Sequence, residues 1–265
     1  MDIGTAKPSA DQRRRVPHHL IDVVDPDEVL SLAQVQAMAY AAIDDILARG
    51  RRPLLVGGTG LTVRAVTEGL RIPAVPPNLE LRAELEARAE REGRHALHVE
   101  LQQVDPAAAA RIDPRNVRRT IRALEVYRVS GRRFSDMGNI APPPYRIVAF
   151  GLHLPRPELY ARIDARVEEM MAAGLVEETR RLAQRYDWSL PSMSGLGYRQ
   201  IGMFLRGECG EAEVVALIKR ETRRFVRHQS NWFRADDARI RWLDARLEID
   251  RDLLSTLQRE ADGVE

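Results

Sequence analysis

The sequence contains one cysteine, Cys209, among its 265 residues. A lone thiol forms no internal disulfide and no cysteine metal cluster, so we expect a reducing compartment, the cytoplasm. Apolar runs of the ~18 to 20 residues that cross a bilayer are missing, as is the apolar core of a signal peptide. We therefore expect neither a secreted nor a membrane-spanning protein.

Lysine is nearly absent too: Lys7 and Lys219 are the only lysines among 41 basic residues, so arginine carries most of the positive charge. Arginine donates hydrogen bonds in a planar fork and stacks on bases, which suits contact with nucleic acid. A GC-rich genome explains the same composition equally well. The net charge of +2, with 44% hydrophobic and 30% charged residues, is ordinary for a folded globular protein.

The first part of the chain has the pattern of an α/β unit. Apolar residues recur at helical spacing between Ser31, a candidate N-cap, and Gly50, a candidate stop. A short apolar strand at 53–56, a glycine turn and a second helix at 61–68 follow. Helix, strand, turn and helix in this order predict a parallel strand.

Two proline-rich segments, 72–78 and 142–144, bracket a stretch from Leu79 to about Arg133 that is helical in pattern throughout. A buried strand is predicted at 145–154 and a last strand at 240–244. Between them we expect helices at 156–173, 175–186 and 211–233, with a loop starting at 189. We therefore predict an α/β core (1–73), an inserted all-helical domain (74–143) and a return to the core (144–265).

Two segments are candidates for binding phosphates. In VGGTG, at 56–60, glycines let backbone approach a ligand at the start of a helix, although a tight connection without a ligand explains them equally well. Residues 111–133 hold eight arginines against Asp113 and Glu125, a local net charge of +6. Nucleic-acid contact is favoured for this second segment over a solvated helix face, because acids normally interleave to balance such a run.

Other conspicuous residues have structural interpretations. Between 219 and 234, Phe225, Trp232 and Phe233 have the spacing of core residues, and the arginines among them face either solvent or RNA. The pair His18 and His19 lacks a third ligand at zinc spacing. No Walker A motif occurs in these 265 residues, which disfavours a related kinase.

Six ordered blocks together resemble the tRNA dimethylallyltransferase family. They are MDIGTAKP (1–8), PHHLIDVVDP (17–26), PLLVGGTGL (53–61), VDPAAAARIDP (104–114), RALEVYRVSG (122–131) and GLGYRQ (195–200). The resemblance implies a P-loop NTPase-like, nucleotide-binding parallel-sheet core with an inserted all-helical domain. It also implies magnesium-dependent transfer of a dimethylallyl group from dimethylallyl diphosphate to N6 of the adenosine just 3′ of the anticodon.

The resemblance implies a set of site residues. Those expected to contact the tRNA anticodon arm are Thr59, Arg82, Arg118, Arg119, Thr120, Ile121, Arg122, Ser194, Gly195, Leu196, Gly197, Tyr198 and Arg199. Thr59 and Arg166 are the expected catalytic residues, with Arg166 positioning the diphosphate. The chain departs from the family at Thr62, where relatives often have tyrosine, and at Ser194, where some have arginine.

A larger departure concerns the front of the chain. In the family a strand, a GxTxxGK[S/T] phosphate loop and a DSxQxY segment with the carboxylate base precede the block DIGTAKP. Here Met1 directly precedes Asp2 of that block, so we expect a mis-called start codon or a fragment without the base and the metal-binding hydroxyl. Two functions remain open: the transferase, or a catalytically inactive tRNA-binding relative. A monomer is expected in either case.

Overall fold

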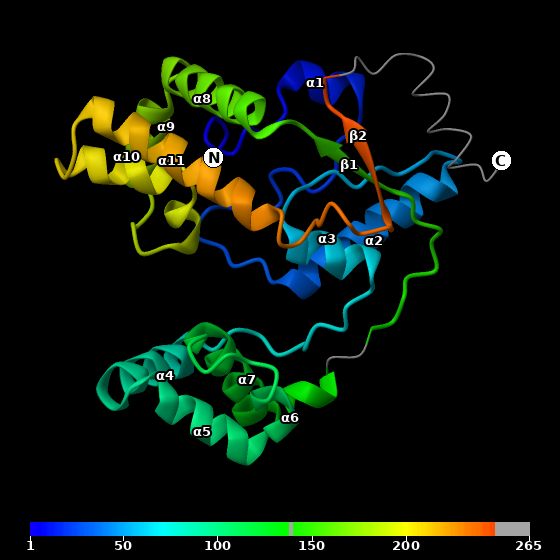
Figure 1. Cartoon of the computed structure of the whole chain (residues 1–265), viewed down its shortest axis with the longest axis vertical. Coiled ribbons are helices and arrows are strands. Elements are labelled where there is room, and N and C mark those ends of the chain that lie inside the picture. The colour runs from blue at the N-terminus through cyan, green and yellow to red at the C-terminus, as the bar shows by residue number, and fades with distance from the viewer. Residues whose placement is uncertain (138–139, 247–265) are drawn as a thin grey trace. The chain divides into compact units, whose positions relative to one another are not determined.

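The computed structural model describes residues 1–137 and 140–246 (Figure 1), and they form two compact units. The first, which we call the core unit, comprises Met1–Val29, Gly58–Gly60 and the residues from Tyr145 onward. The second, the helical unit, comprises Leu30–Gly57 and Leu61–Pro144. The three-part division expected from the proline segments remains a prediction.

The helical unit contains α2 and most of α3, followed by a helical block of α4 to α7 and a 3₁₀ turn, η1 (Figure 1). Their bounds are α2 Leu32–Ala48, α3 Gly60–Thr67, α4 Leu79–Glu92, α5 Arg94–Val104, α6 Pro106–Ala109, α7 Val117–Ser130 and η1 Phe134–Met137. Ser31 caps α2 as predicted, with its side chain accepting from the backbone N–H of Gln34. The predicted linker at 72–78 contains neither helix nor strand.

The core of the helical block follows from its sequence pattern. Leu85 and Ala89 are buried and Leu81 packs against them, as their spacing on one helix face predicts. Leu97 and Leu101 of α5 and Ile121, Ala123 and Leu124 of α7 complete the cluster. Burying these apolar faces against one another stabilises the block.

The core unit is also mainly helical. Its elements are α1 Ala10–Arg15, β1 Ala149–His153, α8 Arg156–Ala172, α9 Leu175–Ala183, η2 Pro191–Ser194, α10 Tyr198–Leu205, α11 Glu211–Gln229 and β2 Ile240–Asp244. Helices α8 to α11 pack around one apolar cluster, made of Val167, Leu175, Tyr198, Ile201, Val214 and Ile218. The helices predicted at 156–173, 175–186 and 211–233 are confirmed, with ends shifted by a few residues.

The sheet of the described residues has two strands. β1 and β2 pair in parallel, with Ala149 opposite Ile240 and His153 opposite Asp244. Gly151 leaves room for the indole of Trp242, because a Cβ at this glycine would lie 2.6 Å from the Trp242 ring. The α/β class and the parallel pairing agree with the prediction, but helix dominates.

Three expectations about apolar segments are wrong. Residues 53–56 form no strand, since none of the described segments pairs with them, and Leu54 and Val56 are 80% and 89% exposed. β1 alternates between half-buried and exposed residues, so it is not the buried strand expected at 145–154. Phe225 and Trp232 are 47% and 42% exposed and Phe233 is half-buried, so none of the three is a fully buried core residue. On α11 the buried side chains are Val214 and Ile218 instead.

Candidate functional site

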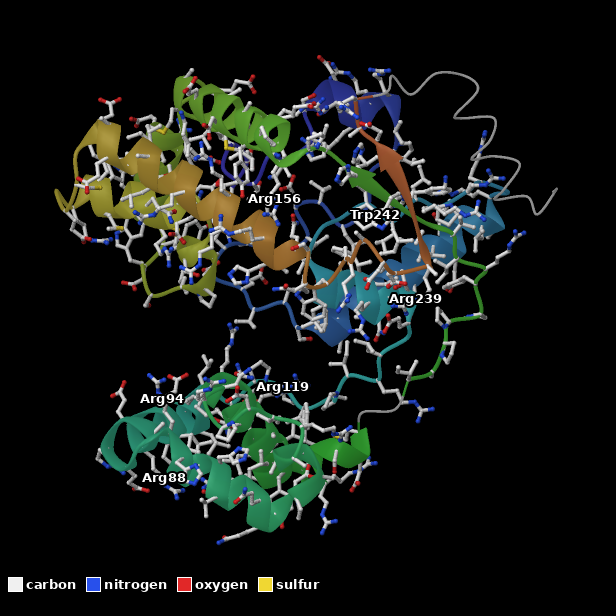
Figure 2. All side chains as sticks on the ribbon, viewed as in Figure 1. Arg88, Arg94, Arg119, Arg156, Arg239 and Trp242 are labelled. Carbon is white, nitrogen blue, oxygen red and sulfur yellow. The ribbon has the colours of Figure 1, made fainter. Side chains whose placement is uncertain are left out.

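The start of α7 carries exposed arginines. Arg118 and Arg119 lie in its first turn, and their side chains form no ion pair or hydrogen bond with any other described residue. The turn is fixed by Asn116, whose side chain accepts from the backbone N–H of Arg119 at 3.2 Å. Figure 2 shows Arg119 and Arg94 on the same side of the helical block in that view, and Arg88 on another side.

A surface hollow of about 620 Å³ lies beside this turn. Its lining residues are Arg94, Asp113, Arg115, Asn116, Val117 and Arg118. Hydrogen bonds from Arg115 lower the pKa of Asp113 to about 2, so this carboxylate stays ionised and holds the guanidinium in place. Three arginines against one carboxylate leave a positive hollow of the kind that attracts phosphates.

The predicted RNA-contacting stretch 118–122 therefore divides in two. Thr120 and Ile121 are buried, with Ile121 in the core and the Thr120 hydroxyl donating to the backbone carbonyl of Asn116. Their side chains support the helix and offer no surface to RNA. Arg118 and Arg119 are its exposed members, and Arg122 is half-buried.

Arg82 and Arg122 share one buried acid, Glu125. Arg82 donates to both oxygens of this carboxylate, from Nε and Nη2 at 2.8 Å each, and Arg122 adds a hydrogen bond from Nη1. Burial raises the pKa of Glu125, but these hydrogen bonds outweigh it and hold the pKa below its ordinary value. The cluster is therefore ionised at neutral pH.

The GLGYRQ block alternates buried and exposed residues. Gly197 adopts φ +91°, a left-handed conformation that favours glycine, and accommodates the turn into α10. Tyr198 is buried, whereas Arg199 is exposed, and none of the described residues pairs with its guanidinium. Of the other predicted members, Ser194 and Leu196 are exposed and Gly195 is half-buried.

Tyr198 and Glu178 hold the N-terminal turn of the chain. The Tyr198 phenol donates to Glu178 at 3.0 Å and accepts from the backbone N–H of Gly4 at 3.1 Å. The Glu178 carboxylate also accepts from the backbone N–H groups of Asp2 and Ile3. Burial, followed by the nearby Glu178 charge, raises the pKa of Tyr198.

The same turn borders a second hollow, of about 650 Å³. Its lining residues are Met1, Lys7, Asp22, Val23, Val24, Asp25, Pro26, Glu28 and Ser192. The Lys7 ammonium lies between the carboxylates of Asp2 and Asp22 and forms an ion pair with each. With acids in excess, this hollow does not share the phosphate-attracting character of the first one.

The glycines of GGTG have a packing role in the core unit. A Cβ at Gly60 would lie 2.2 Å from Cγ of Trp232, and the Gly58 carbonyl accepts from Nε2 of Gln229 at 3.0 Å. Thr59 lies between them with its side chain exposed. The close approach of Trp232, three residues after the end of α11, leaves no room for a side chain at Gly60.

Arg166, the predicted catalytic arginine, is exposed on α8 and forms no ion pair within the described part of the chain. On the same helix, Asp164 pairs with Arg223 of α11, and the Arg223 guanidinium lies 5.3 Å from the centre of the Tyr160 ring. These contacts fix α8 against α11. The free guanidinium of Arg166 is available to an anionic ligand.

The structure contains no group of three or more His, Cys, Asp or Glu residues that fits a metal ion within residues 1–137 and 140–246. We assign none of the described residues to the magnesium ion that the resemblance implies. Across the same ranges, no helix is long and apolar enough to cross a membrane.

Sequence reasoning missed Glu125 and Glu178 as organising residues. Both carry a signal: Glu125 falls four residues after the buried Ile121, and Glu178 falls three after the buried Leu175, so each lies on an apolar helix face. An acid on such a face requires buried donors.

Comparisons with known proteins agree with this arrangement. Residues 1–236 match the profile of a family described as IPP transferase. The tRNA dimethylallyltransferase of Roseiflexus castenholzii is 57% identical over 235 residues, which cover 88% of this chain and 77% of that protein. The crystal structure of the tRNA isopentenylpyrophosphate transferase of Bacillus halodurans superposes with a TM-score of 0.69 at 38% identity, covering all of this chain and 84% of that one.

A eukaryotic dimethylallyltransferase acting on tRNA has the same fold, with a TM-score of 0.79 at 21% identity over 99% of this chain and 70% of that one. The fold and the arginine surface define a helix-rich α/β protein suited to bind nucleic acid. Within this class, the chain belongs to the IPP transferase family, and it is a transferase of the tRNA dimethylallyltransferase kind.

Proposed function

We propose that the chain transfers a dimethylallyl group from dimethylallyl diphosphate to N6 of the adenosine on the 3′ side of the anticodon in tRNA. The observation that carries this proposal is the exposed pair Arg118 and Arg119 beside an arginine-lined hollow, in a member of the IPP transferase family. Neither guanidinium has an ion-pair partner among residues 1–137 and 140–246. Guanidinium groups free of acid partners are available to the phosphates of an anticodon arm.

The reaction replaces one carbon–oxygen bond with a carbon–nitrogen bond. The bond between the allyl carbon and the diphosphate oxygen breaks, its electron pair leaves with diphosphate, and positive charge develops on the allyl group. The N6 lone pair forms the new carbon–nitrogen bond, and one N6 proton is lost. The adenine must leave its stack for its amine to reach the allyl carbon. We assign the proton acceptor to none of the described residues.

The family resemblance implies the roles of individual residues, and their exposure and charge support them. Arg166 binds the diphosphate and stabilises the negative charge that develops on it, because its guanidinium is exposed and unpaired within the described ranges. Thr59, exposed at the start of α3, contributes its hydroxyl to the same reaction. Arg199, with Ser194, Gly195 and the backbone around it, contacts RNA.

The proposal extends to the fold and the setting of the enzyme. The core belongs to the P-loop NTPase-like class, and residues 74–143 are a helical insertion that binds the anticodon arm. The enzyme acts in the cytoplasm as a monomer and requires Mg²⁺. Sedimentation of the pure protein tests the monomer, and chelation during the assay tests the metal requirement.

Transfer of label tests the function directly. The protein is incubated with Mg²⁺, radiolabelled dimethylallyl diphosphate and an unmodified tRNA, and a tRNA with guanosine in place of the target adenosine is the control. Label on N6 of that adenosine alone supports the proposal. Binding of tRNA without transfer supports the alternative, a catalytically inactive tRNA-binding relative.

A further inference from the structure

Glu125 is a carboxylate with no exposed surface in the core of the helical block. Four donors saturate it: Nε and Nη2 of Arg82, Nη1 of Arg122 and the backbone N–H of Asn78, which donates to Oε1 at 2.7 Å. A buried charge with every lone pair satisfied adopts one arrangement, and it fixes the groups that donate to it.

Arg82 and Arg122 remain partly exposed although both donate to Glu125. Their side chains are 33% (Arg82) and 26% (Arg122) exposed. Nη2 of Arg122 donates to the backbone carbonyl of Val75 at 2.9 Å, which ties the proline linker to α7. Nη2 of Arg122 also donates to the backbone carbonyl of Pro73 at 3.4 Å. A guanidinium has five N–H donors, so Arg82 and Arg122 each keep N–H groups that have no partner among the described residues.

A second cluster in the same block provides an internal comparison. Glu100 also accepts from two arginines, Arg88 and Arg128, but these arginines pair with Glu92 and Glu84 as well. Arg91 pairs with Glu92 in turn, so that cluster has three acids and three arginines, whereas the Glu125 cluster has one acid and two arginines. The Glu125 cluster therefore keeps a surplus positive charge where the linker meets α7.

This surplus charge lies on the helix that carries the exposed arginines. Arg118 and Arg122 are four residues apart on α7, so they occupy neighbouring turns of one helix face. A phosphate backbone that contacts Arg118 can reach the exposed edge of Arg122 one turn further along. Two guanidiniums that share a carboxylate are already oriented, so little side-chain entropy is lost when they bind a phosphate.

We propose that Glu125 is a positioning residue for RNA binding: it orients Arg82 and Arg122 so that their outer N–H groups contact a backbone phosphate of the anticodon arm. The inference rests on the proposed function, since it concerns how the same RNA is held. It assigns a binding role to an acid that by charge alone opposes RNA.

Whether Glu125→Gln weakens or strengthens RNA binding tests the positioning role. Removing a negative charge strengthens binding to RNA if only overall charge counts, but it weakens binding if the carboxylate positions the arginines. We expect Glu125→Gln to raise the Kd for an anticodon stem-loop about tenfold and to lower the salt dependence of log Kd by about one phosphate contact. The matched control Glu100→Gln, which removes the same charge from the other cluster, leaves Kd unchanged or lowers it.

Unchanged or tighter binding by a folded Glu125→Gln variant, as judged by circular dichroism, would overturn the proposal. If this variant does not fold, Arg82→Lys and Arg122→Lys carry the test, because lysine keeps the charge and loses the fork. Weaker binding by both variants supports the proposal, and wild-type affinity for both refutes it. A wild-type protein that binds no stem-loop refutes the proposed function itself, and this inference with it.

Discussion

The phenol of Tyr198 donates a 3.0 Å hydrogen bond to the carboxylate of Glu178, and both side chains are buried. Through Gly4, Ile3 and Asp2 this pair holds a turn that is more than 170 residues away in sequence. The tyrosine of the GYRQ block therefore joins two of the conspicuous sequence blocks. Its hydroxyl is occupied by the protein and is not free for RNA.

Tyr198→Phe removes this hydroxyl from a buried network, leaving Glu178 and the Gly4 N–H each short of one partner. We expect the free energy of unfolding to fall by about 1–3 kcal/mol, measured by urea denaturation. Tyr186→Phe is the control, because the Tyr186 hydroxyl has no hydrogen bond within the described part of the chain. An equal effect of both substitutions would show that the network does not stabilise the fold.

The raised pKa of Tyr198 predicts loss of stability in alkali. Above pH 10.0, the ordinary tyrosine pKa, the unfolded chain binds fewer protons at Tyr198 than the folded chain does. The contribution of the protonated phenol to the free energy of unfolding is therefore complete below that pH and declines as pH rises. From about pH 9 to about pH 11 we expect wild-type stability to fall more steeply than that of Tyr198→Phe. Parallel pH profiles for the two proteins would contradict the assignment.

Arg166 and Arg199 are expected to act on different kinetic parameters. In an enzyme active in transfer, Arg166→Ala should lower kcat by about 10²- to 10³-fold, since the charge it stabilises develops in the transition state. Arg199→Ala should mainly raise KM for tRNA, and lysine at either position should rescue only in part. Arg162→Ala, one turn before Arg166 on α8, is the control and should match wild type. Wild-type kinetics for both alanine variants would refute both roles.

Gly60→Ala tests the packing role of the GGTG block. The new methyl group would meet Cγ of Trp232 at 2.2 Å, so Trp232 must move, at a cost of about 1–3 kcal/mol in stability. Gly57→Ala is the matched control in the same block, because its nearest neighbour, a Val63 methyl, lies at an ordinary 3.8 Å. Trp232→Leu in the Gly60→Ala background should restore part of the loss. Equal stability of the two alanine variants would be evidence against this packing.

Local pattern accounts for what the sequence predicted well. Helices such as α2 and α4 are specified by their own caps and apolar periodicity, so Ser31, Gly50, Leu85 and Ala89 fall where expected. Residues 53–56 look like a strand, but a strand needs a hydrogen-bonded partner, which local pattern does not reveal.

In the candidate site, too, local sequence pattern does not reveal contacts between distant segments. Exposed Arg118 and buried Ile121 belong to one stretch, and only the packing of α7 separates the member that faces solvent from the member in the core. The roles of Glu125 and Glu178 depend on donors from distant segments, Asn78 and Asp2 among them. Neither contact is visible in a local window of sequence.

The salt dependence of RNA binding tests the central claim most directly, because phosphate contacts release counterions. A tRNA anticodon stem-loop is titrated with wild type, Arg119→Ala and the control Arg128→Ala, whose arginine is already paired with Glu84 and Glu100. For the wild type we predict that log Kd rises with log salt with a slope of about 2 to 3 between about 50 and 200 mM salt. We also predict a slope smaller by about one for Arg119→Ala and an unchanged slope for Arg128→Ala. Binding that does not depend on salt would contradict the account. An equal change of the slope in Arg119→Ala and Arg128→Ala would contradict it as well.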